Sequence, residues 1–276
     1  MVATPIGNLE DITVRALRVL REVSVIAAED TRRTAHLLAR HAITTRTTSL
    51  HEHNETQKSP ALVARLVGGD SIALVSDAGT PTISDPGGRL IAAAIAAGLR
   101  VEPIPGASAI LAALAVSGLP TETFTFLGFP PTRSKDRKLW FERAVSVAGT
   151  VVFFEAPHRI RATLEELRSL VGDRPMAVAR ELTKTHEQLV RGPISLVLQM
   201  LVEVRGEFTV VVDIGQMTTC ATAEHPSPLA LVTEFGEMTS VDGLTRRQAI
   251  SRLSKRYHIP ANELYDAIEH NKKSVV

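Results

Sequence analysis

Continuous apolar runs and apolar residues at helical spacing alternate through the first 118 residues of the chain. The continuous runs predict buried strands and the helical spacing predicts amphipathic helices. The predicted strands are 23–28, 72–75 and 99–105, and the predicted helices are 14–20, 34–39 and 62–67. Such alternation predicts a parallel, doubly wound α/β sheet.

The stretch 74–88 contains three glycines, two prolines and two aspartates directly after an apolar run. We interpret it as a loop between a strand and a helix, with Asp85 as the N-cap, Pro86 at the first helical position and Gly98 closing the helix. A second such loop opens at Gly106, before a helix that ends at Gly118. Open α/β sheets bind ligands at the carboxyl ends of strands, although one such loop by itself could be an ordinary turn.

The alternation starts again after residue 120. It predicts strands at 150–154, 175–180 and 208–214, a helix at 158–171 and a loop or hairpin at 183–193. Two short amphipathic helices are predicted at 245–255 and 262–269. The expected organisation is an α/β domain at 1–118, a second at 121–216, a linker at 217–228 rich in Thr, Ala, Ser and Pro, and a small helical module at 229–276.

Composition supports packed cores, because 44% of the 276 residues are hydrophobic. No apolar run approaches the roughly 18 residues of a membrane helix, and no signal-peptide pattern is visible, so we expect a cytoplasmic protein with no membrane contact. A single cysteine, Cys220, excludes an internal disulfide and a thiol-rich metal site.

The overall charge is balanced, with 31 basic and 30 acidic residues, but two segments are locally basic. The first, 132–143, includes Trp140 beside its basic residues, and the second, 245–258, has no acidic residue. The second segment fits either a nucleic-acid-binding helix pair or a solvated helical tail.

Several standard signatures are missing: the sequence has no dinucleotide fingerprint, no phosphate-binding loop and no nucleophile elbow. His51 and His53 are the best candidate metal ligands, because they would share one face of a strand. No third ligand is evident, so we favour a polar substrate wall there and expect no metal.

Clusters of ionisable residues follow several predicted strands, at 29–33, 155–159 and 180–187. In the first, Asp30 or Thr31 could simply cap a helix, or Arg32 and Arg33 could contact a phosphate or ribose. Because these clusters all follow strands, we expect them to converge on one ligand-binding crevice.

Six segments together resemble the ribosomal RNA small subunit methyltransferase I family, of the tetrapyrrole-methylase-like superfamily. They are Ala3-Thr-Pro-Ile-Gly-Asn-Leu-Glu-Asp-Ile-Thr13, Glu29-Asp-Thr-Arg32, Ser76-Asp-Ala-Gly-Thr-Pro-Thr-Ile-Ser-Asp-Pro-Gly87, Pro105-Gly-Ala-Ser108, Glu155-Ala-Pro-His-Arg159 and Arg180-Glu-Leu-Thr-Lys184. The resemblance implies two consecutive α/β domains with a cofactor cleft between them. It also implies S-adenosylmethionine-dependent 2'-O-methylation of a cytidine ribose in 16S ribosomal RNA, at the decoding centre of the small subunit, by a homodimer.

Matching positions one by one, the resemblance implies a cofactor site formed by Pro5, Ile6, Asp77, Thr80, Ser108, Ala109, Ala156 and Leu182. Methyl transfer to a hydroxyl needs a base or a cation near the oxygen, and the candidates are Lys184, Glu181, His186 and Glu29. Candidate RNA contacts are Arg32, Arg33, Arg133, Lys135, Arg137, Lys138, Arg159, Arg246 and Arg247, with Trp140 available to a splayed base.

Two other functions remain open at this point: methylation of a tetrapyrrole precursor, and ribosome assembly without catalysis. One departure from the family is the beginning of the chain, where only Met1 and Val2 precede the first motif. Either the start site is set too late or the central strand is shortened.

Overall fold

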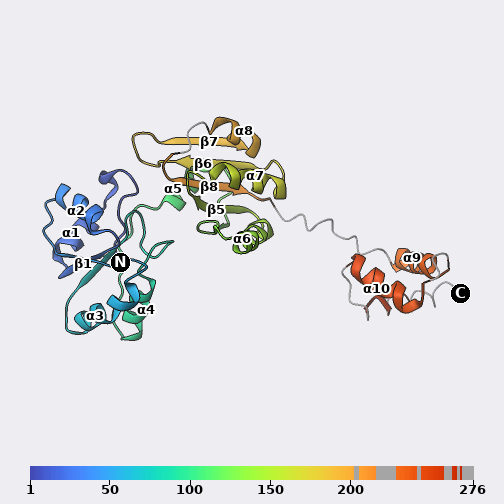
Figure 1. Ribbon diagram of the computed structural model, residues 1–276, viewed down its shortest axis with the longest axis horizontal. Coiled ribbons are helices and arrows are strands. Elements are labelled where there is room, and N and C mark those ends of the chain that lie inside the picture. The colour runs from blue at the N-terminus through green and yellow to red at the C-terminus, as the bar shows by residue number, and fades with distance from the viewer. Residues whose placement is uncertain (202–204, 216–227, 241–243, 258–262, 266–267, 269–276) are drawn as a thin grey trace. The chain divides into compact units, whose positions relative to one another are not determined.

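The computed structural model describes residues 1–201, 205–215, 228–240, 244–257, 263–265 and 268. Its contacts divide the chain into two compact units, Met1–Gln216 and Met217–Val276. The first unit contains two β-sheets with helices packed on them, and the second contains helices (Figure 1). No helix among the described residues is long and apolar enough to cross a membrane.

The first sheet is parallel, with β1 (Val25–Ala28) between β2 (Thr47–Ser49) and β3 (Ile72–Val75). β1 is buried along its whole length, as its continuous apolar run predicts. The chain up to residue 118 also contains five α-helices and a short 3-10 helix at Leu9–Asp11. The α-helices are α1 (Val14–Glu22), α2 (Thr31–Arg40), α3 (Glu55–Val67), α4 (Gly88–Ala96) and α5 (Ala109–Ser117).

Residues at the beginning of the chain lie beside β3. The backbone N–H of Val2 donates to the Leu74 carbonyl at 2.9 Å, and that of Ala3 donates to the Ile104 carbonyl at 3.1 Å. The predicted strand at 99–105 is wrong, because Ile104 alone makes a bridge there. Proline on each side of Ile104 removes the N–H groups that a longer ladder would need.

Helix α4 begins later than predicted and has a different cap. Asp85 and Pro86 precede it, and its N-cap is Gly87, with φ of 112°. The Glu55 carboxylate, on α3, accepts hydrogen bonds from the N–H groups of Gly87, Arg89 and Leu90. The buried Glu55, and not Asp85, therefore accepts the hydrogen bonds of the N–H groups at the beginning of α4. The helix ends as predicted, with Gly98 in the left-handed region.

The second sheet has the order β4-β5-β8-β6-β7. Its strands are β4 (Phe124–Phe126), β5 (Thr150–Glu155), β6 (Pro175–Arg180), β7 (Gln188–Pro193) and β8 (Phe208–Asp213). β4 is parallel to β5, and the other pairs are antiparallel. The segment 183–193, predicted as a loop or hairpin, contains β7, which forms a hairpin with β6. Because β8 is inserted between β5 and β6 in the opposite direction, its first residues lie at the edge where those strands end.

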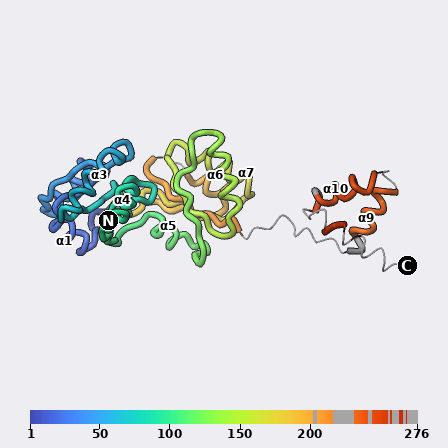
Figure 2. The backbone as a smooth tube through the Cα atoms, turned by 90° about the horizontal axis from the view of Figure 1, so that it is seen from below, coloured from blue at the N-terminus to red at the C-terminus, as the bar shows by residue number. Residues whose placement is uncertain are grey.

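Helices cover both faces of the second sheet. The larger core packs α6 (Ser134–Ser146), α7 (Ile160–Val171) and α8 (Ile194–Met200) on one face. On the other face, Ala113 and Leu114 of α5 pack against Val152, Ala177 and Val211. Figure 2 shows α5 passing from the first sheet toward the second. The two predicted α/β domains therefore meet through this helix, and the division at 118–121 stays a prediction.

The second unit has its own core. Helices α9 (Pro228–Ser240) and α10 (Arg246–Tyr257) bury Leu231, Phe235, Met238, Ala249 and Leu253, together with Leu264 and Ile268. The helix predicted at 245–255 is confirmed as α10, whereas α9 was not predicted. The predicted linker at 217–228, apart from its last residue, and Cys220 lie outside the described residues, as does half of the helix predicted at 262–269.

Candidate functional site

A cavity of about 720 Å³ lies within the first unit and is lined from both sheets. The first sheet contributes the loop after β3, including Gly79 and Thr80, and the second contributes residues at the ends of β5 and β6 and the start of β8. Its volume is typical of small-molecule sites, and its walls are largely apolar with a few polar groups.

Six of the eight predicted cofactor residues line this cavity: Ile6, Thr80, Ser108, Ala109, Ala156 and Leu182. Ser108 is also the N-cap of α5, where its hydroxyl accepts from the Leu111 N–H at 3.5 Å. Thr80 donates its hydroxyl to the Ala107 carbonyl at 3.5 Å and so links the two Gly-containing loops. These six residues come from segments far apart in sequence, and the fold gathers them around one space.

The other two, Pro5 and Asp77, line a smaller cavity of about 200 Å³. It shares Ile6, Ala78 and Glu207 with the larger one, so the two adjoin. Its lining contains more polar groups, including the side chains of Arg33 and Lys184.

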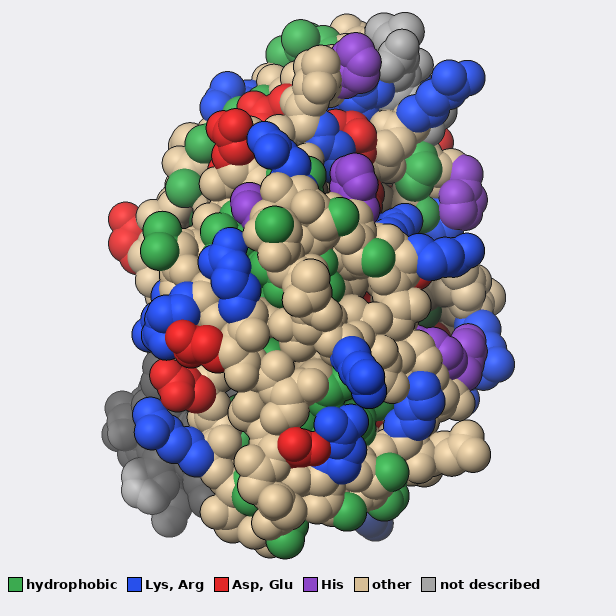
Figure 3. Space-filling model, turned by 90° about the vertical axis from the view of Figure 1, so that its left-hand side faces the viewer, with side chains coloured by type: hydrophobic (Ala, Val, Ile, Leu, Met, Phe, Trp, Pro, Cys, Tyr) green, Lys and Arg blue, Asp and Glu red, His purple; other side chains and the backbone are tan. Residues whose placement is uncertain are grey.

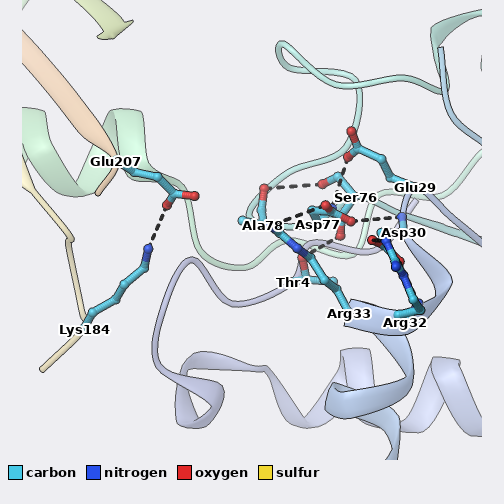
Figure 4. A network of polar contacts seen from close by, with 10 residues as sticks. All are labelled: Thr4, Glu29, Asp30, Arg32, Arg33, Ser76, Asp77, Ala78, Lys184 and Glu207. Carbon is cyan, nitrogen blue, oxygen red and sulfur yellow. Dashed lines mark hydrogen bonds and ion pairs between the residues drawn. The ribbon is translucent and has the colours of Figure 1, made fainter. Parts of the chain in front are cut away.

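Asp77 is the centre of a polar network at the carboxyl edge of the first sheet (Figure 4). Its carboxylate accepts from the Asp30 N–H at 3.0 Å and pairs with Arg33 at 3.3 Å. The Glu29 carboxylate accepts from the Asp77 N–H at 3.3 Å. Asp30 also caps α2 by accepting from the Arg32 N–H at 2.8 Å, so the capping alternative for this cluster is realised.

Burial and mutual repulsion perturb two carboxyl groups beside this network. Burial raises the pKa of Asp85 to about 6, against a hydrogen bond from Ser76, and the negative charges of Glu29 and Asp77 add to the rise. The pKa of Glu29 is also raised, mainly by burial, although the Asp77 N–H opposes the shift. Each group therefore holds its proton more tightly than an exposed carboxyl group would.

Lys184 lies in the smaller cavity between two carboxylates. Its ammonium donates to Glu181 at 2.8 Å and to Glu207 at 3.0 Å. Burial lowers the pKa of Lys184, but the hydrogen bonds and charges of the two carboxylates outweigh burial and the net pKa is raised. At neutral pH this side chain is a cation and has no lone pair with which to act as a base. Glu29 and the exposed His186 line neither of the two cavities.

The loop that carries Lys184 rests directly on the first loop of the chain. A methyl group on Gly7 would lie 2.5 Å from Lys184 Cγ and 2.8 Å from the Leu182 carbonyl oxygen. The Thr183 hydroxyl accepts from the Asn8 N–H at 3.0 Å. Glu181 and Thr183 have φ of 53° and 66°, which is costly for residues with a Cβ and is typical of functional sites.

The predicted RNA-contacting residues differ in exposure. Arg32, Arg33, Arg133, Lys135, Lys138, Arg246 and Arg247 are exposed. On the face drawn in Figure 3, Lys and Arg side chains are spread out rather than gathered into one patch. Arg159 is mostly buried and pairs with the fully buried Glu155 at 2.6 Å. Arg137 is also mostly buried and pairs with Glu166 at 2.8 Å.

The structure overturns two other expectations. The basic segment 132–143 is mostly helix α6, and Trp140 is only 8% exposed, with its indole N–H donating to the Leu127 carbonyl at 2.9 Å. Trp140 packs on Phe141 and Phe153 and is a core residue, because the apolar face of α6 covers the sheet. His51 and His53 follow β2 in a turn rather than sharing a strand face. Among the described residues, no group of three potential ligands could hold a metal ion.

Comparison with known proteins identifies the family. The model of the tetrapyrrole (corrin/porphyrin) methylases matches residues 1–197. A ribosomal RNA small subunit methyltransferase I from Halalkalibacterium halodurans is 41% identical over 96% of this chain and 92% of that protein. One from Synechocystis is 44% identical over 96% of this chain and 95% of that protein. The chain belongs to the ribosomal RNA small subunit methyltransferase I family.

The fold agrees with this assignment to the tetrapyrrole methylases. Uroporphyrin-III C-methyltransferase from Thermus thermophilus, solved in complex with S-adenosylhomocysteine, superposes with a TM-score of 0.54 at 21% identity. The alignment covers 76% of this chain and 94% of that structure. The predicted fold class, two α/β parts followed by a small helical module, is confirmed.

Sequence reasoning missed Glu207 and Phe208, which line the larger cavity of this family member. The predicted site residues lie in loops and at the carboxyl ends of predicted strands, whereas Glu207 and Phe208 lie at the amino end of β8. Phe208 pairs with Glu155 on one side and Arg180 on the other. The antiparallel insertion of β8 therefore brings its first residues to the edge of the sheet that lines the cavity. The acidic Glu207 directly before a strongly apolar run was the available signal.

Proposed function

We propose that this chain is an S-adenosylmethionine-dependent methyltransferase that modifies the 2'-hydroxyl of a cytidine ribose in 16S ribosomal RNA. The observation that supports it most directly is 41% identity, over 96% of the chain, to a relative named ribosomal RNA small subunit methyltransferase I. The cavity lined by both sheets supplies a place for the reaction.

The residues around the larger cavity fit the proposed cofactor. S-adenosylmethionine has an adenine, a ribose and a charged methionine portion, and needs apolar surface together with a few acceptors. The cavity offers small residues such as Gly79 and Ala109, which let a ligand approach the backbone, and the polar side chains of Thr80 and Ser108. When bound, S-adenosylmethionine supplies a methyl group already activated by its sulfonium.

The task of the protein is then to align the ribose hydroxyl and stabilise the charge that develops on its oxygen. We assign the second role to Lys184, since its raised pKa keeps it a cation beside the cavity. The cofactor would supply the methyl carbon to the ribose oxygen and would leave as S-adenosylhomocysteine, and the hydroxyl proton would pass to water or a nearby carboxylate. Glu181, Glu29 and His186 remain the proposed alternatives for proton acceptance.

RNA binding is proposed for the exposed basic residues. Arg133 and Lys135 lie at the beginning of α6, and Arg246 and Arg247 lie on α10 of the second unit. Guanidinium and ammonium groups bind phosphates without reading sequence. We also propose a homodimer acting on the small ribosomal subunit in the cytoplasm.

The test is methyl transfer from radiolabelled S-adenosylmethionine to 30S subunits, to naked 16S RNA and to a tetrapyrrole precursor. Label on the 2'-oxygen of one cytidine supports the proposal, and transfer only to the tetrapyrrole refutes it. Lys184→Ala should lower kcat about 100-fold, as loss of an oxyanion-stabilising group does, while the Kd of S-adenosylhomocysteine stays unchanged. Lys184→Arg keeps the charge and should retain more activity. An unchanged kcat for Lys184→Ala would remove this residue from the mechanism.

A further inference from the structure

Phenylalanine is concentrated around the larger cavity. Five of the eight phenylalanines of the chain line it: Phe124, Phe126, Phe129, Phe154 and Phe208. Phe126 and Phe154 make an edge contact with ring centroids 5.0 Å apart, and the ring of Phe129 lies 5.3 Å from that of Phe154. One wall of the cavity, formed by β4, the loop after it and β5, is therefore aromatic.

Two of these rings are exposed: Phe124 is 39% exposed, and Phe129 is the more exposed of the two. It is 49% exposed, although an aromatic ring of this size gains most by burial. It lies next to Gly128, at whose position an added Cβ would be 3.6 Å from the Ser84 hydroxyl oxygen. The loops containing Phe129 and Ile83 therefore meet at the rim of the cavity, and Ile83 is itself 44% exposed and part of the lining.

The backbone on both sides of this rim is constrained. Thr82 and Ser84 have φ of 74° and 63°, and Gly128 has φ of 65°. Pro130 and Pro131 follow Phe129 and limit the loop further. The exposed side chains of Phe129 and Ile83 are thus presented by loops with a restricted backbone, which favours a preformed binding surface.

Positive charge lies directly beyond Phe129. Arg133 and Lys135 are both exposed, and they lie four and six residues after it, where α6 begins. A half-exposed aromatic ring, followed four and six residues later by exposed cations, matches single-stranded RNA, whose bases stack on aromatic rings while its phosphates contact cations. This charge argues for an RNA base rather than an apolar protein segment as the occupant.

We propose that Phe129 stacks against the target base when that nucleotide is turned out of the RNA, with Ile83 of the adjoining loop beside it and Arg133 and Lys135 on flanking phosphates. This inference rests on the proposed function and adds the residue that receives the base. It replaces Trp140, which the sequence suggested and which is buried. Turning the nucleotide outward places its ribose at the cavity mouth, where the 2'-hydroxyl must be.

The test compares Phe129→Ala and Phe129→Trp with a control, Leu139→Ala, in the purified full-length enzyme. Leu139 is 55% exposed on α6 and lines neither cavity. Loss of one stacked base predicts that Phe129→Ala lowers kcat/KM on 30S subunits at least about tenfold, chiefly through KM. Phe129→Trp should stay near wild type, and Leu139→Ala should have no effect.

Two further measurements separate the alternatives. Calorimetry should give the same Kd for S-adenosylhomocysteine in wild type and Phe129→Ala; a matching loss of cofactor affinity would assign the ring to the cofactor and overturn the proposal. The added tryptophan emission of the Phe129→Trp protein should be quenched by 30S subunits in the presence of S-adenosylhomocysteine, and unchanged emission would overturn it too. A wild-type enzyme that labels no ribose refutes the proposed function, whereas wild-type kinetics in Phe129→Ala refute only the role of Phe129.

Discussion

At the scale of single residues, the environment changes what a side chain does without changing its identity. Asp85 has the pattern of a helix cap in the sequence, but in the fold it lines the cavity and is half-buried near two other carboxylates. Its pKa is raised to about 6, against an ordinary value of 3.8. The group is therefore destabilising when ionised, which is tolerated at a binding site more readily than elsewhere.

The sign of the resulting pH dependence follows from linkage. Because the folded pKa exceeds the unfolded one, ionisation of Asp85 begins to disfavour folding above about pH 4, and the penalty is complete above about pH 6. Asp85→Asn should be more stable than wild type at pH 8, with the difference vanishing near pH 4. The measurement is urea denaturation at both pH values. Asp70→Asn is the control. Because Arg65 lowers the pKa of the Asp70 carboxyl group, this variant should be less stable than wild type at pH 8. An equal shift of the Asp85→Asn midpoint at both pH values would contradict this account.

At the scale of elements, helix ends are satisfied by side chains from other elements as well as by their own caps. Thr13, Asp30 and Ser108 cap α1, α2 and α5 from the adjacent position. Helix α4 instead receives the carboxylate of Glu55, a 6% exposed residue on α3. This contact joins two helices of the first sheet and sets where the loop 76–87 ends.

Glu55→Ala should destabilise the protein by about 3 kcal/mol, because several buried N–H groups lose their acceptor at once. Glu55→Gln keeps one carbonyl oxygen and should cost less. The free energies come from urea denaturation of both variants. Glu52→Ala is the matched control, since Glu52 is exposed three residues earlier, and should stay within about 0.5 kcal/mol of wild type. A Glu55→Ala protein as stable as the control would show that water replaces the carboxylate.

At the scale of the whole molecule, the chain consists of two units with separate cores. The larger unit contains both cavities, and the smaller one presents Arg246 and Arg247 on the surface of α10. This division suggests that catalysis depends on the first unit and that the second adds affinity for RNA.

Ending the chain after Gln216 should therefore leave the thermal midpoint of the first unit and its Kd for S-adenosylhomocysteine unchanged. Binding to 30S subunits should weaken about tenfold or more, and its dependence on salt should become shallower, because fewer phosphates are contacted. Filter binding over a range of salt concentrations measures both. A charge-reversed full chain, Arg246→Glu with Arg247→Glu, should reproduce the loss if charge is the cause. Unchanged subunit affinity would exclude the second unit from RNA binding.

Elements with local signals could be predicted from the amino-acid pattern alone. Strand β6 has the predicted bounds, because a buried strand is a continuous apolar run wherever it is placed. The loops that line the cavity were also predictable, since glycine, proline and small residues mark where a backbone must turn and where a ligand can approach it.

Which distant residues come into contact could be seen only in the folded chain. The antiparallel entry of β8 brings Glu207 to the cavity, the burial of α6 removes Trp140 from the surface, and the chain path leaves Phe129 at the rim. Local pattern states that a residue is apolar or charged, but its partners are set by strand order and helix packing across many residues of separation. Short sequence motifs supply the chemical groups of the site. Their positions depend on how the two sheets pack with helix α5 between them.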